Sequence, residues 1–201
     1  LDFRESAPAK VKRDMYVVDG AAVSKLSRNG HRAVAVPGLV AGLLDAHSRF
    51  GSLDLEKVMG AAIRFAHEGF RIYPELARAL DDRQDLMAKN AAMRTIFFRN
   101  DQILKSGDLL EQRELAVTLN RVKRLGRNGF YRGRIAQAIE TDMRNNGGLI
   151  RKHDLEAYRV KVRNVVRGTY RGYDIVSMPP PSSGGTHLIQ MLNILEHFPI
   201  S

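Results

Sequence analysis

The sequence lacks cysteine, and it lacks any apolar run near the roughly 18 residues that a membrane-spanning helix requires. The absence of cysteine excludes disulfide bonds and thiolate metal sites within the chain, and it is compatible with either the cytoplasm or the periplasm. No N-terminal segment resembles a signal peptide, and no initiator methionine precedes Leu1. We expect this sequence to be a piece cut from a longer protein, so the missing signal says nothing about where the parent is located.

Internal repeats and low-complexity segments are also absent. The 201 residues are 44% hydrophobic and 27% charged, which is ordinary for a globular protein. This length is enough for one medium domain or for part of a larger one.

Positive charge is in excess, with a formal net charge of +10. The segment Arg121–Arg134 carries six basic residues and no acidic one, and Arg151–Arg171 carries seven more against Asp154 and Glu156. Such a surface could bind a polyanion. Because charge bias alone is weak evidence and no aromatic stacking platform accompanies it, we favour a solvated surface and do not expect nucleic acid as a partner.

Helical periodicity dominates the middle of the chain. Glycine or proline punctuates these segments at Gly51, Gly69, Pro74, Gly126 and Gly147, in the pattern of helix starts and stops. The predicted helices run over 38–51, 54–69, 74–86, 115–126 and 135–147. Their apolar stripes are predicted to face the core, including the stripe of Val58, Ala62, Ile63 and Ala66 and the residue Leu86.

Short strands are predicted at both ends of the chain. Residues 16–37 mix apolar runs with turn signals such as Asp19-Gly20. From Tyr158 to Arg163, apolar and basic residues alternate, which predicts a strand with one basic face. Arg171-Gly172 predicts a turn into a second strand, Tyr173–Met178, and a final helix is predicted to bury Leu188, Met191, Leu192 and Leu195. This order predicts an α+β fold.

The stretch Met178–Leu188, MPPPSSGGTHL, combines candidate nucleophiles with glycines. It matches neither a phosphate-binding loop nor a Gly-x-Ser-x-Gly nucleophile turn. Thr186 and His187 are adjacent on a helix and point about 100° apart, so they do not converge as a nucleophile and its base. We expect Ser183 or Thr186 to cap the helix that follows. The six histidines show no metal-binding spacing.

Arg4 is the strongest single candidate for binding a ligand. It lies in Asp2-Phe3-Arg4-Glu5, and its planar guanidinium suits a bidentate carboxylate. An internal ion pair with Asp2, Glu5 or Asp14 is an equally good interpretation of the sequence.

Seven motifs follow one another along the chain: Leu1-Asp-Phe-Arg-Glu-Ser-Ala-Pro8, Val36-Pro-Gly-Leu-Val-Ala-Gly-Leu43, Ala61-Ala-Ile-Arg-Phe-Ala-His-Glu-Gly69, Leu115-Ala-Val-Thr-Leu119, Phe130-Tyr-Arg-Gly133, Tyr170-Arg-Gly-Tyr173 and Met178-Pro-Pro-Pro-Ser-Ser-Gly-Gly185. Together, and in this order, they resemble the motifs of the gamma-glutamyltransferase (gamma-glutamyl transpeptidase) family. The resemblance implies part of an N-terminal nucleophile hydrolase αββα fold, mostly helical here with a few short strands. It identifies residues 1–201 as a single partial domain from the interior of the large subunit.

The same resemblance implies an enzyme that transfers the γ-glutamyl group of glutathione and related compounds to amino acids, peptides or water. Its nucleophile is a Thr of the small subunit, formed when the precursor cleaves itself; that Thr lies outside this chain, so the fragment alone is expected to be inactive. Arg4 matches the arginine that binds the donor's α-carboxylate. No metal or organic cofactor is implied, nor a membrane span, and the full protein is expected to be periplasmic or secreted.

Two departures from the family pattern leave the substrate preference open. Asn164-Val165-Val166 stands where members commonly have a proline, and the basic stretch Arg121–Arg124 is unusual. A related acylase, such as a cephalosporin acylase, therefore stays an alternative. The Ser182-Ser183 and Gly184-Gly185 pairs are not the family's substrate-binding serines or its oxyanion glycines, which belong to the small subunit.

Overall fold

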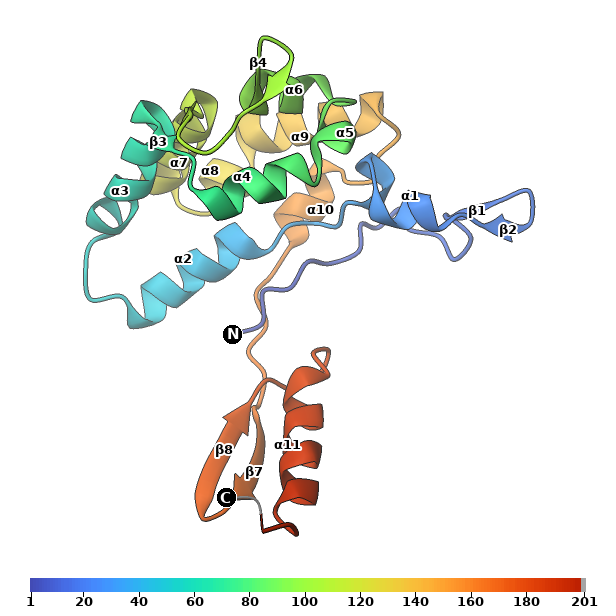
Figure 1. The fold of residues 1–201 in the computed structure, drawn as a ribbon, viewed down its shortest axis with the longest axis vertical. Coiled ribbons are helices and arrows are strands. Elements are labelled where there is room, and N and C mark those ends of the chain that lie inside the picture. Colours follow the sequence, from blue (N-terminus) through green and yellow to red (C-terminus); the bar gives the residue numbers. More distant parts are fainter. Residues whose placement is uncertain (200–201) are drawn as a thin grey trace.

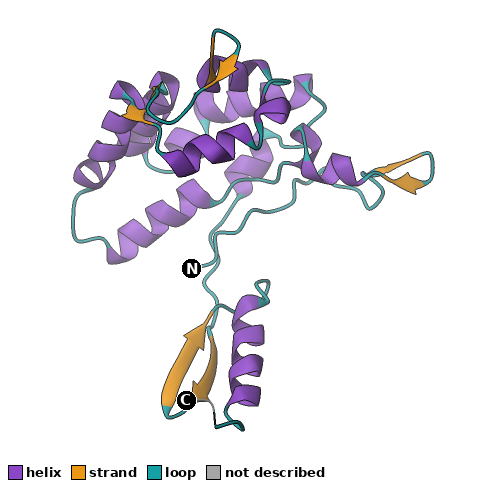
Figure 2. Ribbon diagram, viewed as in Figure 1, coloured by secondary structure: helices purple, strands orange, loops and turns teal. Residues whose placement is uncertain are grey.

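The computed structural model describes residues 1–199 and divides into two parts (Figure 1). A helical body contains the helices α2 to α10, and a smaller ββα unit follows it. An extended linker, residues 159–165, joins the two parts, and the N-terminus lies between them, next to this linker (Figure 1). Helices make up most of the body, and the longest strands belong to the ββα unit (Figure 2).

The helical body is built from short elements. Its helices are α2 (Leu39–Phe50), α3 (Leu55–Glu68), α4 (Pro74–Asp81), α5 (Gln84–Met87), α6 (Ala91–Phe97), α7 (Arg113–Leu125), α8 (Asn128–Tyr131), α9 (Gly133–Asn145) and α10 (Lys152–Ala157). Two antiparallel ribbons accompany them, β3 (Phe70–Arg71) with β6 (Leu109–Leu110) and β4 (Phe98–Arg99) with β5 (Gln102–Ile103). Ahead of them come β1 (Val17–Val18), β2 (Ala21–Ala22), α1 (Ser24–Arg28) and a 3₁₀ turn (His31–Ala33).

The ββα unit consists of β7 (Val166–Tyr170), β8 (Tyr173–Ser177) and α11 (Gly184–Leu195). The strands pair antiparallel from Val166 opposite Ser177 to Tyr170 opposite Tyr173. Arg171 and Gly172 join them with φ of 49° and 82°, the left-handed conformation that two-residue hairpin turns require. The predicted turn is confirmed, and so is the α+β class.

Two separate clusters of buried side chains form the core of the body. The first brings together the start of α2 with α8, α9 and α10, and the second lies under α4 and the short ribbons. The first contains Val36, Ala41, Tyr131, Ala136, Met143, Ile150, Leu155 and Tyr158. The second contains Ile72, Leu80, Ile103, Leu104 and Leu110.

The predicted helix boundaries hold where a glycine or proline sets them. Pro74 occupies the first turn of α4, where its missing N–H costs nothing. Gly69 and Gly126 end α3 and α7 with φ of 82° and 56°. The predicted helix 74–86 is wrong at its end, because α4 stops at Asp81 and Leu86 falls in the separate helix α5, where it is 43% exposed.

Two predicted apolar faces are not buried. On α3 only Ala66 of the stripe is fully buried, and Val58 is 51% exposed. On α11, Leu188 and Met191 are exposed, together with Leu195. That helix packs on the hairpin through another side, since Ile189 contacts Gly168. Periodicity located these helices correctly but did not determine which face finds a partner within the described residues.

The strand predicted from Tyr158 to Arg163 is also wrong. Its one ladder contact is an isolated bridge, in which Asp2 and Lys161 exchange backbone hydrogen bonds of 2.7 and 2.8 Å. Tyr158 is buried in the helical body, whereas Val162 is 69% exposed. The alternation therefore reflects an extended linker that leaves the body, and regular pairing begins later, at Val166.

Candidate functional site

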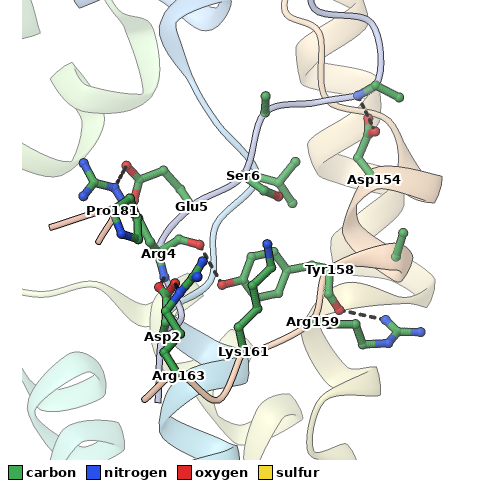
Figure 3. Close-up of a pocket in the computed structure, with 14 residues that line it drawn as sticks. Asp2, Arg4, Glu5, Ser6, Asp154, Tyr158, Arg159, Lys161, Arg163 and Pro181 are labelled. Carbon is green, nitrogen blue, oxygen red and sulfur yellow. Dashed lines mark hydrogen bonds and ion pairs between the residues drawn. The ribbon is translucent and has the colours of Figure 1, made fainter. Parts of the chain in front are cut away.

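Arg4 lies in the extended N-terminal segment, between the helical body and the linker (Figure 3). Its side chain is 56% exposed, and its Nε lies 3.8 Å from Oε1 of Glu5, whose side chain is equally open. An exposed ion pair of this length contributes little to stability. The guanidinium of Arg4 is therefore available to an incoming anion.

Two hydrogen bonds hold the backbone of Arg4. Its amide N–H donates to Oδ1 of Asp2 over 3.0 Å, and its carbonyl oxygen accepts from the hydroxyl of Tyr158 over 2.8 Å (Figure 3). Nearby, Ser6 and Val36 exchange backbone bonds of 3.2 and 2.8 Å. The main chain at Arg4 is thus anchored on both sides, while its side chain keeps its freedom to rotate.

Asp2 binds the linker rather than the Arg4 guanidinium. Its Oδ2 accepts a hydrogen bond from Nε of Arg163. This bond, helped by the Arg4 amide, holds the pKa of the Asp2 carboxyl below its usual value of 3.8. Asp2 is therefore ionised at neutral pH and ties the N-terminal segment to the linker.

Two glycines at the start of α2 allow this segment to approach the body closely. A Cβ on Gly38 would lie 2.0 Å from the carbonyl oxygen of Phe3 and 2.1 Å from the hydroxyl of Tyr158. A Cβ on Gly42 would lie 2.0 Å from Cγ of Phe3. Any larger residue would overlap these atoms, so the two motifs that contain Phe3 and the glycines form two halves of one contact.

A stack of side chains holds Tyr158 in place. Its ring is nearly parallel to that of Tyr131, with centroids 5.9 Å apart, and the Arg127 guanidinium lies 4.5 Å from the Tyr131 centroid. The Tyr131 hydroxyl donates to the carbonyl of Pro37 over 2.7 Å and accepts from the amide of Ala41 over 3.2 Å. Burial raises the pKa of both phenols, so both hydroxyls stay protonated at neutral pH.

Two cavities flank Arg4. One, of about 450 Å³, also has Asp2 and Tyr158 in its wall (Figure 3). The other, of about 1020 Å³, is bordered by Arg4 and by Met178 and Ser182 of the proline-rich loop. This loop and Arg4 come from opposite ends of the chain, and sequence reasoning missed their proximity because nothing local signals it.

The helix after the loop is capped differently from the prediction. Ser183 is the N-cap residue, but its backbone is helical and its side chain makes no capping bond. Instead Oγ of Ser182 accepts from the amide of Gly184 over 3.4 Å. Thr186 and His187 lie within the helix and are exposed, outside the residues that line either cavity.

Many of the basic side chains have internal partners. Arg127 donates to the carbonyl of Tyr158, and Lys123 pairs with Glu56 at 2.8 Å. Arg151 and Arg159 likewise donate to backbone carbonyls. These contacts favour a structural role for the two basic segments over a polyanion-binding one.

The part of the chain that the structure describes contains neither a metal-binding cluster nor a membrane-spanning helix. Among residues 1–199, no three His, Asp or Glu side chains gather as a metal site would require. Within the same range, no helix has the length and apolar character needed to cross a bilayer.

Comparisons with known proteins agree along the whole chain. A family model described as gamma-glutamyltranspeptidase matches residues 1–201. The glutathione hydrolase proenzyme of Escherichia coli (strain K12) is 44% identical over 200 residues, which cover 98% of this chain and 34% of that protein. The Acylase ACY 1 proenzyme of Pseudomonas sp. (strain V22) is 37% identical over 207 residues, covering 100% of this chain and 37% of that protein.

The crystal structure of Helicobacter pylori gamma-glutamyltranspeptidase has the same arrangement. It is 44% identical, with a TM-score of 0.97 over 100% of this chain and 58% of that chain. The prediction of part of an N-terminal nucleophile hydrolase fold is thereby confirmed. The chain spans about a third of the length of the curated relatives it matches.

Proposed function

Because the chain belongs to the gamma-glutamyltranspeptidase family, we propose that the full-length protein transfers the γ-glutamyl group of glutathione and related compounds to amino acids, peptides or water. The observation that carries this proposal is the family match over residues 1–201, within which Arg4 is exposed beside a cavity on an anchored backbone. A guanidinium binds a carboxylate through two parallel hydrogen bonds, so Arg4 suits the α-carboxylate of a γ-glutamyl donor.

In this proposal the chain supplies donor binding, and a small subunit of the same precursor supplies the reacting group. The nucleophile is an N-terminal Thr outside this sequence, and its own α-amino group acts as the base. Attack of the Thr hydroxyl on the γ-glutamyl carbonyl breaks the amide C–N bond, and the amine leaves with the proton that the base took from the hydroxyl. The resulting γ-glutamyl ester is then resolved by an amino acid, a peptide or water, which regenerates the free Thr. Relatives described as proenzymes support such processing.

An acylase for a different amide is the second candidate. The Acylase ACY 1 proenzyme covers as much of this chain as the glutathione hydrolase proenzyme does, at lower identity. A substrate comparison separates the two functions. Hydrolysis of a cephalosporin amide without turnover of a γ-glutamyl anilide would favour the acylase.

The test of the proposed function is Arg4→Ala in the full-length precursor. We expect KM for γ-glutamyl-p-nitroanilide to rise about 10- to 100-fold, the range for a lost hydrogen bond to a charged group. The 4-aminobutyryl anilide lacks the α-carboxylate, so its KM should not change between wild type and variant. Steady-state release of p-nitroaniline measures both.

The control is Arg78→Ala on α4, because that side chain is 75% exposed and its nearest carboxylate, Glu75, lies 3.8 Å away. It should leave both donors unaffected. An Arg4→Ala enzyme with wild-type KM for the γ-glutamyl donor would remove Arg4 from the binding site.

We further propose that the 201-residue chain alone is inactive. We also propose that the full protein is periplasmic or secreted, and cell fractionation checks this localisation.

A further inference from the structure

The contacts of the Arg4 side chain do little to fix its orientation. Its ion pair with Glu5 is long and exposed. A side chain with four rotatable bonds reaches a ligand reproducibly only if its Cα–Cβ bond points the right way. That direction is set by the main chain at Arg4, so the groups that hold this main chain determine where the guanidinium can reach.

We propose that Tyr158 is a positioning residue for donor binding, which acts by fixing the carbonyl of Arg4 through its hydroxyl. The inference rests on the proposed function, because it assigns a role to Tyr158 only if Arg4 binds the donor carboxylate. On the other side, the amide of Arg4 donates to Oδ1 of Asp2 over 3.0 Å. We call these two hydrogen bonds to the Arg4 main chain the clamp.

The surroundings of Tyr158 make it a rigid anchor. The residue is 5% exposed, and its ring stacks on that of Tyr131. Its main chain follows directly after α10, and its carbonyl accepts from Arg127. A Cβ on Gly38 would lie only 2.1 Å from the Tyr158 hydroxyl, so the hydroxyl packs directly against the residue before α2. Neither the ring nor the hydroxyl can move without disturbing the first core cluster.

The clamp also connects Arg4 to both parts of the molecule. Tyr158 anchors the Arg4 carbonyl to the helical body, and the pair of Asp2 and Arg163 anchors its amide to the linker that leads into β7. Arg4 lies between these two attachments, beside the cavity that the loop of the ββα unit also borders. If either attachment were lost, the guanidinium would still be present, but it would occupy a wider range of positions.

The test is Tyr158→Phe in the full-length precursor, which keeps the ring and removes the hydroxyl. We expect KM for γ-glutamyl-p-nitroanilide to rise about 3- to 10-fold, as for a lost neutral hydrogen bond, with kcat unchanged. KM for the 4-aminobutyryl anilide should not change. Because Tyr158 acts through Arg4, the double variant with Arg4→Ala should show no more loss than Arg4→Ala alone.

Tyr131→Phe is the matched control, since it removes a neighbouring buried hydroxyl that binds Pro37 and Ala41 instead of Arg4. Because it removes two hydrogen bonds, it should lower the melting temperature at least as much as Tyr158→Phe does, yet leave KM unchanged. Equal KM changes for the two phenylalanine variants, or additive losses in the double variant, would overturn the proposal while leaving the proposed function intact. An Arg4→Ala enzyme without a KM change would overturn both.

Discussion

At the scale of single residues, Gly42 is a position within a helix where we expect glycine to be more stabilising than alanine, because it contacts Phe3. Glycine in a helix interior is usually destabilising by about 0.5–1 kcal/mol relative to alanine, because it loses more backbone entropy on folding. Here a Cβ would overlap the ring of Phe3, at 2.0 Å from Cγ. We therefore expect the cost of displacing that ring to exceed the entropy that an alanine would save.

We expect Gly42→Ala to destabilise the full-length protein by about 1–3 kcal/mol, the usual cost of overpacking a core. Gly60→Ala on α3 is the control, because a Cβ there meets nothing within 4 Å. It should stabilise by about 0.5–1 kcal/mol. Urea unfolding of the two variants measures the change in the free energy of unfolding, which should fall for Gly42→Ala and rise for Gly60→Ala. Stabilisation by both alanines would mean that the N-terminal segment does not pack on α2 in solution.

The resemblance to a known family singled out Arg4 as the candidate donor-binding residue, and nothing in the sequence pointed to the residues that hold its backbone. From the residue type alone, an internal ion pair with a neighbouring carboxylate is as good an interpretation of Arg4 as a ligand-binding role, and the structure does place Glu5 within 3.8 Å of it. Tyr158 was misread as a strand residue, because alternation over six positions is the same whether the partner is another strand or a core. Its bond to Arg4 joins residues 154 positions apart, and no local pattern records such a contact.

At the scale of elements, the buried Asp154 joins α10 to the N-terminal segment. It is 8% exposed, and its Oδ2 accepts from the amide of Arg151, which opens the helix. Its Oδ1 accepts from the amide of Ala9, 145 positions away, over 2.8 Å. One carboxylate therefore caps a helix and also fixes the chain that carries Arg4.

Asp154→Ala should destabilise the full-length protein by about 3 kcal/mol, since two amide donors lose a charged acceptor. The exposed Glu75→Ala on α4 should change stability by less than about 0.5 kcal/mol, as for other surface ion pairs. Thermal unfolding monitored by circular dichroism compares the two. Equal small effects would show that water replaces the carboxylate at Ala9 and Arg151.

Helix ends were predictable because their causes are local. Gly69 and Gly126 stop helices through their own backbone conformation, and Pro74 starts one through its own ring. The buried faces of α3 and α11 were not predictable in the same way. Burial depends on a partner surface, and for Val58 and Met191 none lies within the described residues.

The whole molecule exposes more surface than a compact monomer of the same mass. It exposes 14095 Å² of surface, whereas a compact monomer of its mass exposes about 9,500 Å². Large apolar side chains contribute to the excess, among them Met191 and Ile194 on α11, at 54% and 61% exposed. The chain covers 34% of one relative and 58% of another, and we expect further polypeptide of a full-length protein to pack against these surfaces.

This openness predicts unequal local stability. A two-stranded hairpin with one helix has little core of its own, whereas α9 buries Ala136 completely. In the 201-residue chain, amides of β7, β8 and α11 should exchange with deuterium at least about tenfold faster than those of α9. In the full-length protein the ββα amides should slow markedly while α9, the internal control, stays the same. Equal exchange of the ββα unit in both proteins would show that the unit is stable without further packing.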